Sequence, residues 1–455
     1  MTAGECPSVD VAIIGGGIAG LAAAFAAHRA GRSVVLLEAS DRVGGKIASA
    51  EVAGGAVDVG PDSFLARVPW AIELCAELGM AADLVEPATG QAWLWTRGRL
   101  RPLPAGLVLG VPSRLLPLAR AGVLSWTGLA RAALPGTMSG RLTGRRRYQV
   151  PEDPSVAEAI GRHLGRQVVD QLVDPLLGGI NAGDSDRLSL GAAAPALVEA
   201  TGSTGLMRAL RARPPMATIG PVFLAPRIGM TGLTSRLTAS LPEGVIRLGT
   251  PVDRISPADN GWLVGSYARA RRVIVATPAW IAASLLRPHH AEIADELDAI
   301  VYSSVALTVL AYRRNDARLP PGSGMLVPRR EGRLLTAASW YDQKWPNQAR
   351  PDHVLIRASA GRLGDDRAMR LDDANLAACL HEELRVAIPS IASAPVDSVV
   401  TRWPRAFPQY EPGHGARVDR IMAGLPRGIS LAGAAYRGVG LAACIREGLA
   451  AGRRE

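Results

Sequence analysis

A run of glycines between a short apolar strand and an alanine-rich helix constrains this chain more than any other feature. Val9–Ile14 predicts a strand buried on both faces, and Gly20–Ala30 predicts a helix that stops at Gly31. Between them, Gly15-Gly16-Gly17-Ile18-Ala19-Gly20 satisfies the pattern G-x-G-x-x-G. The first glycine permits a tight turn, the second lets backbone approach a pyrophosphate, and the third lets the helix pack closely on the strand. The segment therefore predicts a phosphate-binding helix N-terminus.

The next strand carries the second half of this signal. Ser33–Glu38 predicts a strand that joins the first through a right-handed crossover, so the two should be parallel. Glu38 ends it, where a carboxylate accepts ribose hydroxyls and repels a 2′-phosphate. A glycine-rich core turn is the alternative interpretation. Strand, helix and Glu38 together favour an adenine dinucleotide other than NADP.

Three further segments are rich in bare backbone. Arg42, Gly44, Gly45 and Lys46 follow the second strand, and a glycine doublet there offers more N–H donors to the same diphosphate; a plain loop is the alternative. The run Gly60-Pro61-Asp62-Ser63 bends the chain. Near the C-terminus, Gly438 and Gly440 precede a predicted helix, which resembles a second cofactor-binding edge.

Composition excludes several classes of protein. The chain has 51 Lys+Arg against 41 Asp+Glu, but its arginines are dispersed and its aromatic content is 4%, so we expect no nucleic-acid partner. Only Lys46 and Lys344 are lysines. The four cysteines lie far apart without a C-x-x-C pair, which argues against a disulfide framework or a zinc site and favours the cytoplasm. The histidines lack metal-ligand spacing, so no metal is expected.

One segment leaves two alternatives open. Leu103–Leu134 mixes apolar residues with spaced prolines and arginines. It predicts either an amphipathic element at the inner face of a membrane or a helical pair packed on the core, and the second is favoured.

Taken together, the motifs resemble the porphyrinogen oxidases among the flavin amine oxidase-like proteins, and most closely the Gram-positive coproporphyrinogen III oxidases. The resemblance runs from about residue 9 to residue 450. It is carried by "EASDRVGGKI", "VGPDSFLAR", "DPLLGGINAGDSDRLSL", "SWYDQKWPNQA", "RWPRAFPQYEPGH" and "LAGAAYRGVGLAACI".

The resemblance implies an α/β protein: a Rossmann-like FAD domain of the GR2 type, an α+β substrate domain with a mixed sheet, and a helical membrane-type domain. The implied boundaries are 1–68, 217–285 and 403–455 for the discontinuous FAD domain, 69–216 for the helical domain and 286–402 for the substrate domain.

Carried over by position, the resemblance also implies the binding residues. The implied FAD contacts are Gly15, Gly16, Gly17, Ile18, Ala19, Gly20, Glu38, Ala39, Arg42, Gly45, Lys46, Gly60, Pro61, Asp62, Ser63, Val252, Trp403, Gly433, Val439, Gly440 and Leu441. The implied substrate contacts are Arg67, Leu177, Gly178, Gly179, Asn181 and Leu326.

The pattern departs from the family where propionates are held. Val68 stands where relatives often have a second basic residue, and Ala92 lies near the place of an arginine in some eukaryotic relatives. Arg67 is the substitute candidate, and a solvated surface arginine is its alternative. No catalytic acid or base is identified.

The implied reaction is the six-electron oxidation of coproporphyrinogen III to coproporphyrin III in heme biosynthesis, with FAD and three O₂ giving three H₂O₂. Protoporphyrinogen IX is the alternative substrate. More remote alternatives are another flavin amine or polyene oxidase, or a flavin-binding partner without turnover. A transient contact with a ferrochelatase, peripheral membrane contact and a monomer or homodimer are the implied associations.

Overall fold

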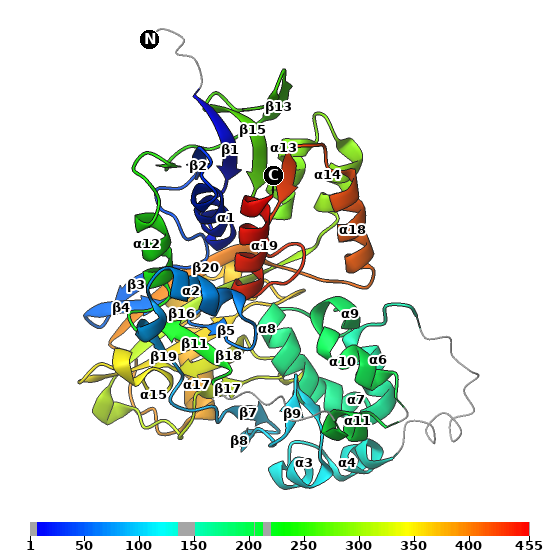
Figure 1. Cartoon of the computed structure of the whole chain (residues 1–455). Coiled ribbons are helices and arrows are strands. Elements are labelled where there is room, and N and C mark those ends of the chain that lie inside the picture. Colours follow the sequence, from blue (N-terminus) through cyan, green and yellow to red (C-terminus); the bar gives the residue numbers. More distant parts are fainter. Residues whose placement is uncertain (1–6, 135–150, 204, 213–219, 455) are drawn as a thin grey trace.

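The computed structural model describes residues 7–134, 151–203, 205–212 and 220–454, and two seven-stranded sheets dominate it (Figure 1). The first sheet has the order β12-β2-β1-β15-β14-β13, with β21 also paired to β15. Its strands are β1 (Ser8–Ile14), β2 (Val34–Leu37), β12 (Ile246–Arg247), β13 (Ile255–Ala258), β14 (Gly261–Val264), β15 (Ala268–Val275) and β21 (Ile429–Leu431).

The predicted βαβ unit is confirmed. β1 pairs in parallel with β2, so that Val11 to Ile14 stand opposite Val34 to Leu37, and β15 lies in parallel on the other side. A hairpin turn at Asn260-Gly261 joins β13 to β14 in antiparallel register. Strands far apart in sequence thus bring their carboxyl ends to one edge of the sheet.

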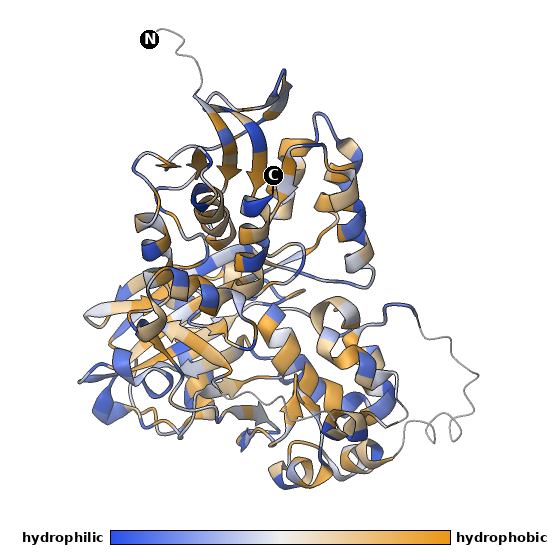
Figure 2. Ribbon diagram, viewed as in Figure 1, coloured by the Kyte–Doolittle hydropathy of each residue, from blue (hydrophilic) through white to orange (hydrophobic). Residues whose placement is uncertain are grey.

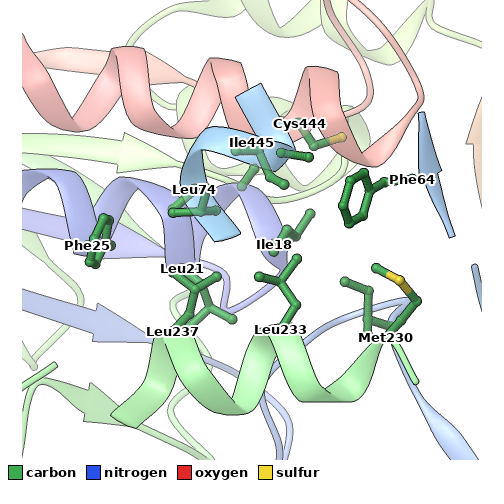
Figure 3. Packing of buried hydrophobic residues seen from close by; sticks show 14 of the residues in the cluster. Ile18, Leu21, Phe25, Phe64, Leu74, Met230, Leu233, Leu237, Cys444 and Ile445 are labelled. Atoms are coloured by element: carbon green, nitrogen blue, oxygen red, sulfur yellow. The ribbon is translucent and has the colours of Figure 1, made fainter. Parts of the chain in front are cut away.

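Helices cover both faces of the first sheet. On one face α1 (Ile18–Arg29), α2 (Trp70–Glu77), α12 (Thr231–Ala239) and α19 (Leu441–Arg453) enclose one core, and Figure 3 shows Leu21, Leu233 and Ile445 meeting there. On the other face lie α13 (Ala279–Leu286), α14 (Ala291–Asp298) and α18 (His414–Gly424). Between α1 and α19 the approach is close, because a Cβ on Gly448 would lie 2.2 Å from the Ala19 carbonyl oxygen.

The second sheet has the order β20-β16-β19-β18-β17-β7-β8. Two of its strands, β7 and β8, come from the stretch 69–216 that the resemblance assigns to the helical domain. The domain boundaries themselves stay a prediction. The strands are β7 (Trp93–Thr96), β8 (Arg99–Pro102), β16 (Tyr302–Arg313), β17 (Gly324–Leu326), β18 (Leu335–Trp340), β19 (His353–Ala360) and β20 (Asp397–Pro408).

Short elements surround this sheet. The helices are α15 (Tyr341–Lys344), α16 (Arg367–Arg370) and α17 (Asp373–Ala387). Short 3₁₀ turns lie at Ala81–Asp83, Arg314–Asp316, Arg329–Glu331 and Pro346–Gln348. The small sheets pair β3 (Ser49–Val52) with β4 (Gly55–Asp58), β9 (Leu107–Val108) with β10 (Val111–Pro112), and β11 (Phe223–Pro226) with β5 (Phe64–Leu65) and β6 (Leu84–Val85).

The remaining helices form a separate body with its own core, at the lower right of Figure 1. Among them, α6 ends before Gly165, whose φ is +87°, and the chain continues through α7 into a π-helix, Val169–Gly178. The elements are α3 (Leu115–Ala121), α4 (Trp126–Ala133), α6 (Val156–Leu164), α7 (Arg166–Val168), α8 (Gly179–Asn181), α9 (Leu190–Ala193), α10 (Pro195–Thr201) and α11 (Leu206–Ala212).

Leu118, Ala121 and Ala132 of α3 and α4 are buried in this core, as the favoured interpretation of Leu103–Leu134 expects. In the described ranges, every helix is too short or too polar to cross a bilayer. Figure 2 shows apolar and polar residues alternating along these helices.

Candidate flavin-binding site

In the glycine turn at the end of β1, some glycines are required by close packing and others face open space. Gly15 adopts a φ of +101°, and its N–H donates to the Leu37 carbonyl at 2.8 Å. A Cβ on Gly20 would lie 1.9 Å from the Gly15 carbonyl oxygen, so only glycine fits there. A Cβ on Gly17 would meet nothing within 4 Å. Gly20 therefore serves the fold, whereas Gly17 faces free space.

The glycine doublet lies directly against this turn. The Gly44 N–H donates to the Gly16 carbonyl at 2.8 Å, and a Cβ on Gly45 would lie 3.3 Å from the Gly17 Cα. Arg42 donates to the carbonyls of Gly45 (2.8 Å) and Ile47 (3.1 Å), so its guanidinium closes the loop. The two glycine motifs form one surface of bare backbone.

Glu38 lies beneath the turn, half-buried. Its carboxylate accepts a hydrogen bond from the Gly16 N–H at 2.5 Å and another from the Ser40 hydroxyl at 2.8 Å. The Thr250 N–H donates to the Glu38 carbonyl at 2.8 Å, which brings the loop of half-buried Val252 beside it. Exposed Ala39 follows Glu38, so the predicted nucleoside-binding residues are neighbours.

Two uncapped helix N-termini face the same region. The N-cap residues are Gly17 for α1 and Gly440 for α19, and neither helix has a side-chain cap. Contacts of Gly448 with Ala19 and of Gly452 with Ala23 make the helices parallel. Because α19 starts seven residues before Gly448, its N-terminus extends about 10 Å beyond that of α1. Free N–H donors are thus offered at two points along one elongated ligand.

Lys46 stands beside the N-terminus of α19. Lys46 is an exposed residue, but desolvation by the surrounding protein lowers its pKa, and Cys444 in the first turn of α19 opposes this effect. No carboxylate pairs with Lys46 among the residues that the structure describes. An exposed cation without a carboxylate partner in the described ranges, beside a helix N-terminus, is suited to an anionic ligand.

The segment Gly60–Ser63 comes close to Lys46 through its first residue. A Cβ on Gly60 would lie 1.9 Å from the Lys46 carbonyl oxygen, so glycine is required at this crossing. The Val59 carbonyl accepts a hydrogen bond of 2.8 Å from the Trp403 indole, which places Trp403 of β20 at the same segment. The bend is therefore held on one side by the backbone of Lys46 and on the other by Trp403 of β20.

Asp62 is the centre of an ion cluster that the sequence did not reveal. Its Oδ2 lies 2.8 Å from the Lys344 ammonium and 2.8 Å from the Arg357 guanidinium, and the Trp345 indole donates to it at 3.3 Å. Burial alone would raise the pKa of Asp62, but Lys344 and Arg357 outweigh it and hold the pKa well below its usual range. Arg357 also donates to the Gly60 carbonyl at 2.5 Å. Lys344, which had no predicted role, thus anchors a predicted flavin-contacting segment.

The predicted substrate residues have unequal access to solvent. Leu177, Gly178 and Asn181 are buried, and the Asn181 amide donates to the Leu177 carbonyl at 2.8 Å. Gly179 is exposed, and a Cβ there would meet nothing within 4 Å. Leu326 is half-buried in β17. Among these five, Gly179 is the residue most open to a flat ligand.

Arg67, the sixth predicted substrate residue, is half-buried, and its Nε has no hydrogen-bond partner. Arg67 stays a candidate for carboxylate binding. The alternative, a plain surface arginine, also stays open.

The donor set fits FAD. Its features are two uncapped helix N-termini offset along the helix direction, an open Gly17, a carboxylate at the end of β2, and Lys46 beside the N-terminus of α19. Gly433, whose Cβ would meet only Ala19 at 4.0 Å, leaves room beside the α19 loop of Gly438–Leu441. A dinucleotide with a second planar group matches this elongated arrangement.

Comparison with known families decides the class. The model of the family described as flavin containing amine oxidoreductase matches residues 18–454. The chain belongs to this family. It is therefore an FAD-dependent oxidoreductase, and the residues that hold its flavin stay a prediction.

Relatives of this flavin oxidoreductase match over nearly the whole length. It is 32% identical to the coproporphyrinogen III oxidase of Bacillus subtilis, over 97% of this chain and 96% of that protein. It is 34% identical to the coproporphyrinogen III oxidase of Mycobacterium tuberculosis H37Rv, over 95% and 94%. The chloroplastic protoporphyrinogen oxidase 1 of Arabidopsis thaliana is 28% identical, over 97% and 87%.

Solved structures share the architecture. A candidate protoporphyrinogen oxidase from Exiguobacterium sp. 255-15 superposes with a TM-score of 0.85 at 31% identity, covering 98% of each chain. The cyclohexylamine oxidase of Brevibacterium oxydans, at 18% identity and a TM-score of 0.70, shares the fold, covering 98% of this chain and 99% of its own.

Proposed function

We propose that the protein oxidises coproporphyrinogen III to coproporphyrin III, removing six electrons with three O₂ and releasing three H₂O₂. The single observation that carries the proposal is the full-length likeness to proteins named for this reaction, at 32–34% identity. The candidate site supports it, because its bare glycine backbone and open helix N-termini suit the diphosphate and the ring of FAD.

When bound, FAD would supply the two-electron redox chemistry that each of the three rounds needs. The chain's own residues bind and orient. Gly17 and Gly440 present helix N-termini to negative charge, and Lys46 adds a compact cation. The Asp62 cluster fixes the bend of Gly60–Ser63, and Gly179 leaves room for a flat macrocycle. Orientation of two planar reactants is the main catalytic contribution of such a site.

Protoporphyrinogen IX is the second candidate substrate, because the Arabidopsis relative is named for it. Coproporphyrinogen III has two more propionates, and arginine forks suit carboxylates. The curated bacterial relatives, named for coproporphyrinogen III, favour the tetracarboxylate.

The test is turnover of both porphyrinogens by the FAD-loaded protein, followed by porphyrin fluorescence and peroxide release. We expect a higher kcat/KM for coproporphyrinogen III than for protoporphyrinogen IX. A strong preference for protoporphyrinogen IX would reverse the substrate assignment. Peroxide release with amines but with neither porphyrinogen would overturn the proposal in favour of an amine oxidase.

We also propose that the protein contacts an anionic membrane surface through its helical body. Residues 87–151 contain ten arginines and no Lys, Asp or Glu, so this stretch carries the whole net charge of +10. The rest of the chain is balanced. Such concentrated positive charge is attracted to anionic lipid headgroups.

The described part of this stretch also exposes apolar side chains. Trp126 of α4 is 85% exposed and Leu116 of α3 is 59% exposed, and Leu134, directly after α4, is 39% exposed. Exposed Arg114 and Arg120 flank Leu116. Aromatic and aliphatic side chains among cations are typical of a helix that lies at a lipid surface.

Vesicle co-sedimentation tests this contact. We expect binding to phosphatidylglycerol-containing vesicles that falls with salt and is weakened in Trp126→Ser combined with Leu116→Ser. The matched control is Val386→Ser, which removes a 53% exposed apolar residue on α17. Equal binding of all variants would refute the contact. A ferrochelatase contact, the cytoplasmic location and the choice of monomer or homodimer stay predictions.

A further inference from the structure

Arg405 lies in a bulge of β20, where the strand departs from its regular pairing with β16. In the pairing of β20 with β16, Trp403 is opposite Val305 and Phe407 is opposite Ser303, so three residues of β20 face Ser304 alone. Within this bulge Arg405 has a φ of +47°, and its N–H donates to the Ser304 hydroxyl at 3.0 Å. Bulges and left-handed non-glycine residues are strained, and both occur where a side chain must be aimed at a ligand.

The guanidinium of Arg405 is held by aromatic rings. Its Cζ lies 4.5 Å from the centre of the Trp280 ring and 6.0 Å from that of Tyr302. Within the described ranges no carboxylate pairs with it, and the residue is exposed. Stacking orients a guanidinium without using its N–H donors. The planar fork is therefore fixed in direction and free to bind two oxygen atoms.

This fork lies at the edge of the predicted flavin site. Trp280 is in the first turn of α13, three residues after Thr277, and Ala276 and Thr277 come within 3.0–3.2 Å of a Cβ placed on Gly15. Tyr302 joins the same corner, because its hydroxyl accepts a hydrogen bond from the Ala279 N–H at 2.9 Å. Two residues before Arg405, Trp403 binds the Val59 carbonyl. Arg405 thus stands where β20, α13 and the glycine turn meet.

We propose that Arg405 binds a carboxylate of the substrate, a role that rests on the proposed porphyrinogen oxidation. The chemistry that the fork recognises is a pair of anionic oxygens, found in a propionate and also in the FAD diphosphate. The propionate is favoured, because the helix N-termini and Lys46 are the predicted diphosphate contacts, whereas apolar Val68 and Ala92 stand at or near the places of basic residues in relatives.

The main test compares Arg405→Gln with the wild-type holoenzyme. We expect KM for coproporphyrinogen III to rise about tenfold or more, as for loss of a charge-assisted hydrogen bond, with kcat within twofold and the Kd of FAD unchanged. With coproporphyrinogen III tetramethyl ester, which lacks carboxylates, the two proteins should have the same KM. Arg29→Gln is the matched control, because Arg29 stacks on Phe25 at the far end of α1.

The outcomes separate the two sources of anionic oxygen. A weaker FAD Kd with unchanged porphyrinogen KM would assign Arg405 to the diphosphate and overturn the proposal, as would no change in either. Coproporphyrin III binding, measured by fluorescence quenching, should weaken in Arg405→Gln even without turnover, so this readout is independent of the proposed reaction. If Arg405→Gln does not fold, Arg405→Lys, which keeps charge but loses the fork, should raise KM by a smaller factor; an unchanged KM would refute the assignment.

Discussion

The ammonium of Lys344 lies 2.8 Å from Asp62 Oδ2, and this pair joins α15, beside the second sheet, to the bend of Gly60–Ser63 that follows β4. Arg357 binds the same oxygen. Three largely buried charges thus tie a predicted flavin-contacting segment to a distant part of the chain. The geometry gives the second sheet a direct role in holding that segment in place.

Lys344→Met should weaken both this tie and FAD binding. The change leaves Asp62 with Arg357 alone, and breaking a buried pair in this way lowers the free energy of unfolding by about 3 kcal/mol. Urea unfolding and FAD titration measure the two effects. Lys344→Arg should restore most of the loss, since it returns a cation. If Lys344→Met unfolds and binds FAD like the wild type, the pair has no such role.

Gly17→Ala and Gly20→Ala should separate cofactor binding from folding. Gly17→Ala places its Cβ in free space, so the apoprotein should keep its stability while the Kd of FAD rises at least tenfold, roughly the loss of one good contact. Gly20→Ala places its Cβ 1.9 Å from a backbone oxygen, so the apoprotein should be destabilised. Thermal unfolding of both apoproteins and FAD titration provide the check. A stable Gly20→Ala apoprotein would contradict this division.

Asp58→Asn should change how stability depends on pH. Burial raises the pKa of Asp58 to about 6, opposed by the Met230 N–H and by Arg357, whereas the unfolded value is 3.8. The folded state therefore holds the proton more tightly, and stability falls as pH rises from about 4 to about 6. The variant lacks this loss, so its advantage over wild type should grow by up to about 3 kcal/mol across that window.

Denaturant unfolding at several pH values measures the difference between the Asp58 variant and the wild type. Asp342, whose pKa burial also raises to about 6, is present in both proteins and cancels. A difference that stays constant with pH would contradict the assignment.

His414→Phe should act in the opposite direction. Burial lowers the pKa of His414 to about 4, while the unfolded value is 6.5. Its stabilisation is complete above pH 6.5 and is lost as pH falls toward 4, by about 3 kcal/mol. Phenylalanine retains the stacking on Tyr410, whose ring centre is 4.0 Å away, but does not titrate. The variant should therefore lose less stability than wild type between pH 7 and pH 4.5, and parallel curves would disprove this.

Much of the first sheet and its cofactor edge could be predicted from local sequence. The strand of Val9–Ile14, the turn of Gly15 and the parallel pairing of the next strand follow from β-branched runs, glycine conformation and the handedness of crossovers. The division of the helix over Val156–Leu177 was not predicted. Gly165 and Pro175 mark it in the sequence, but a π-helix depends on the packing around it.

The sequence by itself determined the predicted cofactor-binding turn of Gly15–Gly20 with Glu38, because a positive φ, a bare backbone and a carboxylate at a strand end are properties of a few neighbouring residues. Only the tertiary structure decided what surrounds that turn. Lys344 and Asp62 are 282 positions apart, and Arg405 meets Trp280 through a bulge between paired strands. Such contacts depend on how two sheets pack and how their strands register, and no local pattern carries that information.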